Sequence, residues 1–341
     1  MSSALDNGVV AETLAQFRTN IRIKGDRTGV WILNIIILIF LFYWAPNFFN
    51  AGNIHAVLND ASILGIGAAG MTILIMAGAF DLSVTAIMGL APIVALLLAG
   101  NLAGPLIVLI SILTGAVLGA INGLIITRGN VAPFVATLGT LFAFGSIGAV
   151  ITDGNAVYVQ SPFVLELAGG KVWGLIPYSF FILLVVCAMC WLVLRRLHMG
   201  RWIRAAGSNI RAAHVSGIDL QWVYLFLFVA SGALTGLAGI ILTGYLSSAV
   251  ATQAPNYNLN AIAAVVVGGT SLRGGEGTLL GTVLAAWLFA MVNNGLILVG
   301  VNSYWQYLAT GVILVLVLVL ALALGMVSSG NYFSSRAQSR D

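Results

Sequence analysis

The sequence predicts an all-α integral membrane protein with about ten transmembrane helices, and three observations lead to this fold class. Of the 341 residues, 60% are hydrophobic and 7% are charged, whereas a typical soluble domain has about 25% charged residues. Long stretches contain no Lys, Arg, Asp or Glu, and the basic residues cluster between them. Such a chain cannot cover a soluble surface with polar groups, so we expect lipid to be its main solvent.

The uncharged stretches are divided into spans by length and by turn residues. A transmembrane helix needs roughly 20 apolar residues, so the longest stretches must hold two helices each. Turn-forming residues divide them at 101–105, at 255–260 and at 300–303. The predicted spans are residues 30–46, 61–80, 82–101, 104–127, 131–152, 175–194, 221–246, 259–271, 277–299 and 303–326. The eighth is short, which suggests a broken or re-entrant helix shielded by protein.

The distribution of Lys and Arg predicts the orientation of the chain, because cytosolic loops carry an excess of both. If the N-terminus is cytosolic, all basic residues except Lys171 fall on the cytosolic side. The C-terminus is then cytosolic as well. The same count indicates that the short eighth span crosses the membrane, since Arg336 and Arg340 would otherwise lie outside.

The chain divides into three parts. Residues 1–29 form a cytosolic N-terminal segment, in which Leu14, Phe17 and Ile21 share one face of a predicted amphipathic helix at the membrane surface. Residues 30–326 form the transmembrane domain, and residues 327–341 form a cytosolic tail. Inside the transmembrane domain, the basic loop 195–219 holds five arginines between two apolar spans. A polar loop of this size predicts a docking site for a partner.

The sequence lacks the residue patterns of several enzyme classes. It contains no G-x-x-x-x-G-K-[ST] nucleotide-binding loop, its three histidines are scattered, and no Ser/His/Asp arrangement is visible. Cys187 and Cys190 lie in an apolar span and are expected to be packing residues. We therefore expect no catalytic residue, no metal and no cofactor. The basic pI reflects arginines at the inner membrane surface and does not indicate nucleic-acid binding.

Carboxylates within the membrane are typical of ion-coupled transporters. The candidates here are Asp60, Asp81 and Glu276, and each falls at the end of a predicted span. This placement favours transport that is powered by another protein over transport by a proton- or sodium-coupled carrier. Within the spans, the pairs Gly115/Gly119 and Gly232/Gly236 have the small-xxx-small spacing that lets helices pack closely; the alternative is that such glycines line a pathway or act as hinges.

Three local motifs stand out. The first, MAGAFDLSV at 76–84, places Asp81 where it can cap the third span or contact a partner at the inner mouth. In the second, at 200–218, Ser208 or Asn209 can cap a short helix over 210–216 that ends at Gly217. The third, VVVGGTSLRGGEGTLLG at 265–281, allows a tight turn before the ninth span, and NNGLILVGV follows at 293–301.

Together these motifs resemble the permease subunit of the ribose-type branch of ABC importers, which take up monosaccharides. The resemblance covers roughly residues 50–325. The family typically reads GGIDLSVG, GxNxxAAxxSGI, GGTSLxGGxGT and NNGL, and this chain reads AGAFDLSVT, GSNIRAAHVSGI, GGTSLRGGEGT and NNGLILVGV. The departures cluster in the first motif, at Ala77, Ala79, Phe80 and Thr85.

The resemblance implies a multi-pass protein of the bacterial inner membrane that works as a homodimer or as a heterodimer with a similar permease. It implies a separate cytosolic ABC ATPase that hydrolyses ATP, and a periplasmic solute-binding protein that delivers the sugar. The basic loop 195–219 then contains the helix that couples to the ATPase. The residues expected to serve this coupling are Arg201, Arg204, Gly207, Asn209, Arg211, Ala212, Ala213 and Gly217. The residues expected at the inner mouth are Asp81, Ser83, Arg273 and Glu276.

Polar and aromatic residues in the spans are candidates for the substrate pathway. The candidates are Asn122, Phe134, Asn293 and Asn294; for the three amides, hydrogen bonding between helices is the alternative interpretation. We expect no tight binding site, because selectivity should rest with the binding protein.

A weak internal symmetry relates two halves of the chain. Residues 118–123 resemble residues 290–295, and the loops that follow lie on opposite sides of the predicted membrane, which suggests an inverted repeat. Two alternative functions stay open: a branched-chain amino acid ABC permease, and an ion-coupled carrier or channel that works without an ATPase.

Overall fold

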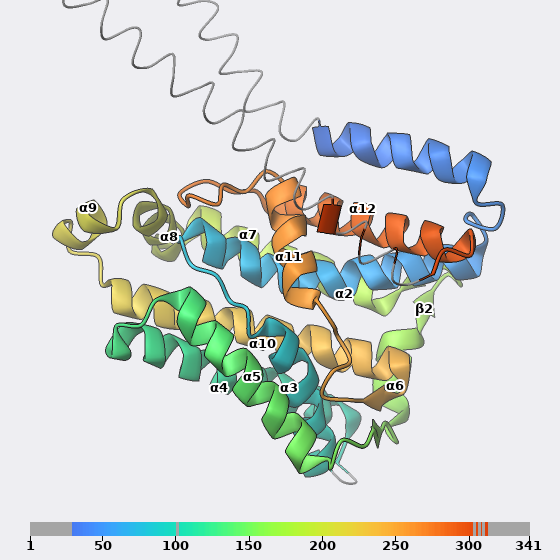
Figure 1. Ribbon diagram of the computed structural model, residues 1–341, viewed down its shortest axis with the longest axis horizontal. Coiled ribbons are helices and arrows are strands. Elements are labelled where there is room, and N and C mark those ends of the chain that lie inside the picture. The colour runs from blue at the N-terminus through green and yellow to red at the C-terminus, as the bar shows by residue number, and fades with distance from the viewer. Residues whose placement is uncertain (1–28, 100–101, 303–304, 306–307, 309–310, 313–341) are drawn as a thin grey trace, which may run out of the picture.

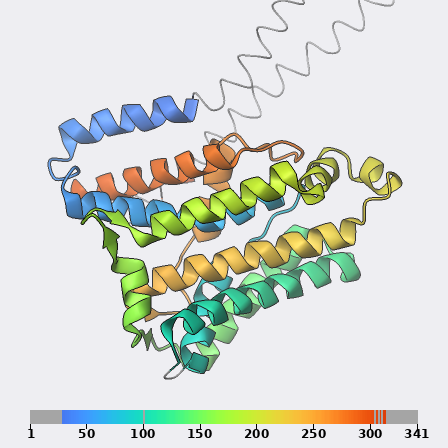
Figure 2. The same ribbon diagram turned by 180° about the vertical axis from the view of Figure 1, so that it is seen from behind.

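The computed structural model describes residues 29–99, 102–302, 305, 308, 311 and 312. The predicted amphipathic helix at 1–29, the C-terminal tail and most of the predicted span 303–326 lie outside these residues. The described chain is mostly helical, and its long helices lie roughly side by side in one bundle (Figure 1; Figure 2 shows the reverse side).

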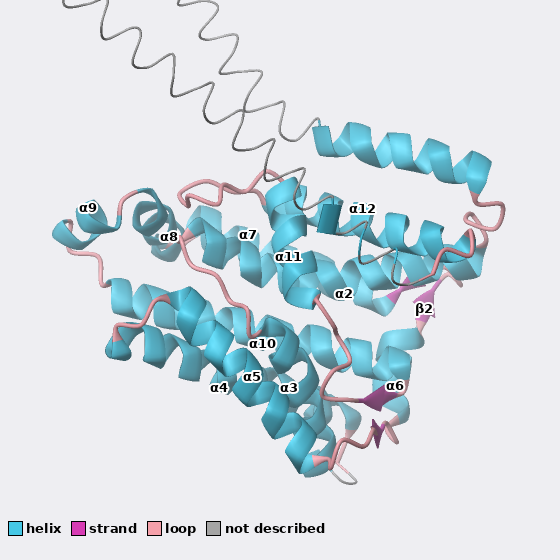
Figure 3. Ribbon diagram, in the orientation of Figure 1, coloured by secondary structure: helices cyan, strands magenta, loops and turns pink. Residues whose placement is uncertain are grey.

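The helices are Gly29–Trp44, α2 (Ala51–Met76), α3 (Val84–Ala99), α4 (Gly104–Gly129), α5 (Pro133–Ile151), α6 (Pro162–Gly169), α7 (Tyr178–Arg196), α8 (His198–Ser208), α9 (Ile210–Val215), α10 (Leu220–Leu246), α11 (Tyr257–Val267) and α12 (Leu279–Leu298). Four two-residue strands form two antiparallel pairs (Figure 3), β1 (Val157–Tyr158) with β4 (Ser248–Ala249) and β2 (Lys171–Val172) with β3 (Ile176–Pro177).

Within the described residues, 6 helices are long and apolar enough to cross a membrane, and three apolar helices are shorter. The six are α2, α4, α5, α7, α10 and α12, and each overlaps a predicted span. The short ones are the helix Gly29–Trp44, α3 and α11. The eighth span, 259–271, was predicted to be short, and it corresponds to the short helix α11. Helix α3 is shorter than its predicted span and contains Pro92.

The start of α2 differs from its prediction. The Asn50 side chain caps this helix by accepting a hydrogen bond from the Gly52 backbone N–H at 2.9 Å, so α2 begins at Ala51 and not near residue 61. As a result Asp60 lies inside the helix. The expectation that every candidate carboxylate falls at a span end is wrong for Asp60.

The chain does not run as continuous helix through the middle of the bundle. After α2, residues 77–83 lead in non-helical conformation to α3, and after α10 residues 247–256 lead to α11. The starts of the two short helices meet: the Asn258 backbone N–H donates to Thr85 Oγ1 at 3.0 Å, and its side-chain amide donates to the Leu82 carbonyl at 3.3 Å. These bonds join α11 to the beginning of α3.

Helices α4 and α10 pack closely, and glycines permit this approach. A Cβ added to Gly115 or Gly119 would lie under 3.0 Å from the carbonyl oxygen of Gly232 or Phe228 on α10. Ser111 Oγ also donates to the Gly236 carbonyl at 2.8 Å. The small-xxx-small spacing therefore does what was predicted, because it brings two helix backbones into direct contact.

Candidate functional site

The three sequence motifs meet at one place, where the end of α2, the end of α8 and the turn before α12 come together. We call this the motif junction: Met76 to Gly78, Gly207 with Ser208, and Gly274 with Gly275. The Gly275 backbone N–H donates to the Met76 carbonyl at 2.8 Å. A Cβ added to Gly207 would lie under 3.0 Å from both of these atoms. The junction is thus a backbone-to-backbone contact that glycine alone permits.

Positive backbone angles explain why the turn before α12 is rich in glycine. Gly274 and Gly275 have φ values of 81° and 83°, a conformation that residues with a Cβ rarely adopt. A Cβ at Gly274 would also lie 2.8 Å from the Gly207 Cα. The Arg273 and Glu276 side chains on either side of these glycines are exposed. Thr278, and not Glu276, caps α12 by accepting from the Gly281 N–H at 3.5 Å.

The short helix α9 forms as the sequence predicted. The Asn209 side chain accepts from the Ala212 backbone N–H at 3.0 Å. Gly217, with a φ of 81°, follows the helix end, and the Ile218 N–H donates back to the Ala213 carbonyl at 3.2 Å. Figure 1 places α9 at one end of the molecule, beyond the ends of the long helices, where α8 is its packing partner.

The predicted coupling residues divide into two groups by exposure. Arg201, Arg211 and Ala212 are exposed, as is Asn209, whereas Ala213 is buried beneath α9. Arg204 is half-buried, and its guanidinium donates to the Leu194 carbonyl at 3.0 Å, which fixes α8 to the end of α7. The exposed group can contact a partner. Arg204, Ala213 and Gly207 instead hold the shape of the loop.

A buried chain of hydrogen bonds links the first motif to α4 and α5. Asp81 Oδ1 accepts from the Ser83 backbone N–H at 2.9 Å and from Ser83 Oγ at 2.6 Å. Asn122 donates to Ser83 Oγ at 2.7 Å and accepts from Thr140 Oγ1 at 2.7 Å. All four side chains are buried. The network ties residues 77–83 to α4 and α5. Asn122 thus makes hydrogen bonds between helices, as in the alternative interpretation of this residue. The Asp81 carboxylate binds Ser83 just before the start of α3.

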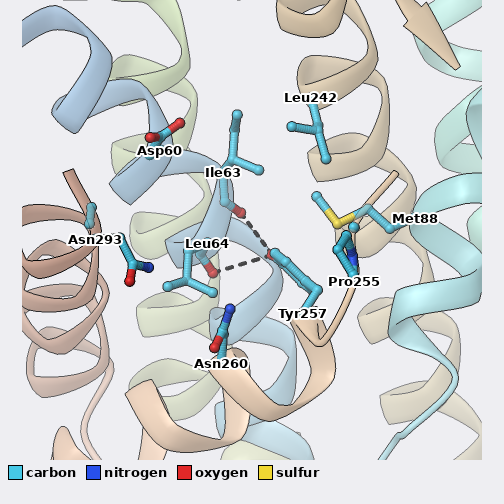
Figure 4. A pocket seen from close by; sticks show the side chains of 11 residues that line it. Asp60, Ile63, Leu64, Met88, Leu242, Pro255, Tyr257, Asn260 and Asn293 are labelled. Carbon is cyan, nitrogen blue, oxygen red and sulfur yellow. Dashed lines mark hydrogen bonds between the residues drawn. The ribbon is translucent and has the colours of Figure 1, made fainter. Parts of the chain in front are cut away.

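A cavity of about 190 Å³ lies between α2, α3, α10, α11 and α12. Figure 4 shows Asp60 from α2, Asn260 from α11 and Asn293 from α12 around it. Its wall is otherwise formed mainly by apolar side chains and by Tyr257, whose hydroxyl donates to the Ile63 carbonyl at 2.8 Å. Gly67 leaves room for that hydroxyl, because a Cβ there would collide with it.

The predicted pathway residues do not gather in one place. Asn293 lines the cavity. Asn294 and Asn53 form a reciprocal amide pair, at 2.9 Å and 2.8 Å, that joins α12 to α2. Asn122 belongs to the buried network, and Phe134 is 56% exposed at the start of α5. A pathway role for these four stays a prediction.

Sequence reasoning missed Asp60 and Asn260 as lining residues. The capping residue Asn50 was the signal that could have placed Asp60 inside α2. Asn260 stands at the start of the predicted span 259–271, and no local pattern shows which helix it faces.

These features define a class: a multi-pass helical membrane protein with broken helices around a small, mainly apolar cavity that contains a few polar side chains, as transport proteins have. Comparison with known proteins identifies the family within this class. The chain belongs to the family described as branched-chain amino acid transport system / permease component, which matches residues 53–318. It is therefore a permease subunit of a transport system, multi-pass in the bacterial inner membrane, and the predicted resemblance is confirmed.

Three relatives show how far the similarity extends. The ribose import permease protein RbsC of Haemophilus influenzae is 38% identical over 290 residues, which cover 84% of this chain and 90% of that protein. RbsC of Bacillus subtilis is 38% identical over 293 residues, covering 85% and 90%. The galactose/methyl galactoside import permease MglC of Escherichia coli is 33% identical over 306 residues, covering 84% and 91%. No solved structure matches the chain.

Proposed function

We propose that this permease imports a monosaccharide across the inner membrane in a complex driven by a separate ABC ATPase. The observation that carries the proposal is similarity over 84–85% of this chain to permeases named for ribose and for galactose import. A periplasmic solute-binding protein delivers the sugar, and a second permease copy, identical or similar, completes the pathway. The sequence supports the separate ATPase, because it holds no recognisable nucleotide-binding loop.

The proposed topology has ten spans with both termini in the cytosol. Six long and three short apolar helices account for nine spans over the described residues 29–298, and residues 303–326 supply the tenth. Arg128 ends α4, which runs antiparallel to α10 and so finishes near α9. Arg195 and Arg196 end α7 beside α8, whereas Lys171 precedes the opposite end of α7. This separation supports the motif junction and α9 as the cytosolic side.

The proposed inverted repeat pairs α2, α3 and α4 with α10, α11 and α12. In each set a long helix is followed by a non-helical segment, a short helix and another long helix. The packing repeats as well: α10 contacts α3 and α4, and α2 contacts α11 and α12. Asn122 and Asn294, from the two sequence segments that resemble each other, lie in α4 and α12. Such repeats place substrate sites at their interface, near the middle of the membrane.

The proposed coupling element is α9, held by α8 at the motif junction. Arg201, Asn209, Arg211 and Ala212 face the ATPase, while Arg204, Gly207, Ala213 and Gly217 set the shape that is presented to it. Because Gly207 of α8 contacts the end of α2 and the turn before α12, a displacement of α9 can reach two long helices through α8. ATP-driven closure can then switch the bundle between two packed arrangements.

The test is ATPase stimulation by the assembled complex. The permease is reconstituted into nanodiscs with its ATPase, and the cognate binding protein is added after loading with ribose, galactose or leucine. Stimulation by a monosaccharide and not by leucine is expected. Stimulation by leucine alone would overturn the sugar assignment and favour the branched-chain amino acid alternative.

A further inference from the structure

The cavity between the short helices holds the side chains that carry a further inference. Asp60, Asn260 and Asn293 come from three different helices and face the same space of about 190 Å³. At roughly 30 Å³ per molecule, this volume holds about six waters. A space of this size suits one small polar solute, and its position between α3 and α11 places it at the interface of the proposed repeats.

These three side chains differ in one respect from the asparagines that join neighbouring helices. Asn294 is paired with Asn53, Asn122 with Ser83 and Thr140, and Asn258 with the start of α3. In contrast, no described residue makes a hydrogen bond with the side chains of Asp60, Asn260 or Asn293. Asp60 is exposed and Asn260 and Asn293 are half-buried, so all three are open to the cavity. Their polar atoms are therefore available to hydrogen-bond a ligand that enters it.

The charge of the lining selects the class of ligand. Asp60 is the only ionisable acid or base other than Tyr257 among the eleven lining residues, so the cavity carries one carboxylate and no cationic side chain. A carboxylate here accepts hydrogen bonds from hydroxyl groups and repels an anionic solute. Leu64, Met88 and Leu242 offer apolar surface to the carbon face of a ring.

We infer that this cavity is a substrate subsite inside the permease for an uncharged, hydroxyl-rich solute, with Asp60 as its main hydrogen-bond acceptor and Asn260 and Asn293 as amide partners. The inference rests on the proposed function and goes beyond it, because it locates a binding step within this chain and excludes anions such as sugar acids. It is compatible with the expectation that the permease has no tight binding site, because the subsite is proposed to be weak.

The test measures protection of a cysteine placed in the cavity wall. Cys187 and Cys190 are replaced by Ala, and Leu242→Cys is introduced, because Leu242 lines the cavity without being one of the polar groups. Modification by a methanethiosulfonate reagent is followed in nanodiscs with ribose, galactose or gluconate. Tyr158→Cys, at a side chain that is 73% exposed and does not line the cavity, is the positional control.

We expect ribose or galactose to slow modification at position 242 and not at position 158, and gluconate to have no effect. Asp60→Asn keeps the size of the side chain and removes its charge; it should raise the half-protecting sugar concentration about ten-fold or more, the usual effect of losing a hydrogen bond to a charged group. Asp153→Asn is the matched control, because Asp153 is exposed and its φ of 50° suits Asn.

Two results would overturn the inference. One is a cavity that no neutral sugar protects, and the other is equal protection by gluconate. If the wild-type complex imports sugar on ATP while protection is absent, the subsite is wrong and the proposed function stands. Protection without ATP-dependent import leaves the subsite in place and overturns the proposed function.

Discussion

Replacement of Gly207 by alanine tests the contact that joins the three motifs. The added Cβ would lie under 3.0 Å from the Met76 carbonyl oxygen and the Gly275 nitrogen, and 3.0 Å from the Met76 carbonyl carbon. All three are backbone atoms, so no side-chain rotation can relieve the collision. Overpacking of this kind costs about 1–3 kcal/mol, which corresponds to a roughly 5- to 150-fold change in an equilibrium constant.

The assay has two readouts on the same preparation. Thermal unfolding of the purified permease should move to lower temperature, and the fraction of ATPase that co-purifies should fall, because α8 can no longer seat against α2. Gly139→Ala in α5 is the control, since no atom lies within 4 Å of a Cβ there, and Ala in place of Gly favours a helix by up to about 1 kcal/mol. Wild-type stability together with full ATPase retention in Gly207→Ala would refute the reasoning.

Three further predictions concern single contacts. Asn209→Ala removes the cap of α9 and should cost about 1 kcal/mol of local stability. The loss should appear as faster amide hydrogen exchange over residues 210–215, whereas Asn209→Asp should exchange at nearly the wild-type rate. Equal exchange rates in the two variants would contradict the capping role. Arg211→Glu should reduce ATPase co-purification without changing thermal stability, because that side chain is exposed. Arg204→Glu should reduce both, because the Arg204 guanidinium donates to the Leu194 carbonyl. Identical behaviour of the two variants would contradict the division into partner-contacting and shape-holding arginines. Asn53→Leu and Asn294→Leu should each destabilise the permease, and the double variant should lose less stability than the sum of the two single losses. A double-mutant cycle in detergent should give a coupling energy of about 0.6–1.7 kcal/mol. Additive losses would show that the amide pair contributes nothing.

Local patterns predicted the features that depend on neighbours in sequence. The helix α9, its Asn209 cap and its end before Gly217 formed as predicted, because capping involves residues within one turn. The close approach of α4 and α10 was also predictable, since glycine spacing determines how near two helix backbones can come. The long apolar helices followed from hydropathy alone.

Features that depend on long-range packing were not predictable in the same way. Sequence patterns placed breaks between α2 and α3 and between α10 and α11, but they could not show that the starts of α3 and α11 meet, because that contact joins residues far apart in the chain. Asp60 and Asn260 are two hundred positions apart, and only the fold brings them to one cavity. The motif junction is a similar case: each motif was visible, yet nothing in one segment shows that it contacts the other two.

The central claim is that this chain transports only as part of an ATP-driven complex, and uptake into proteoliposomes tests it most directly. Vesicles that contain the permease and its ATPase, with ATP enclosed where the ATPase faces the interior and sugar-loaded binding protein added outside, should take up labelled monosaccharide. Vesicles without the ATPase should move none, with or without a proton or sodium gradient. Gradient-driven uptake by the permease alone would contradict the claim.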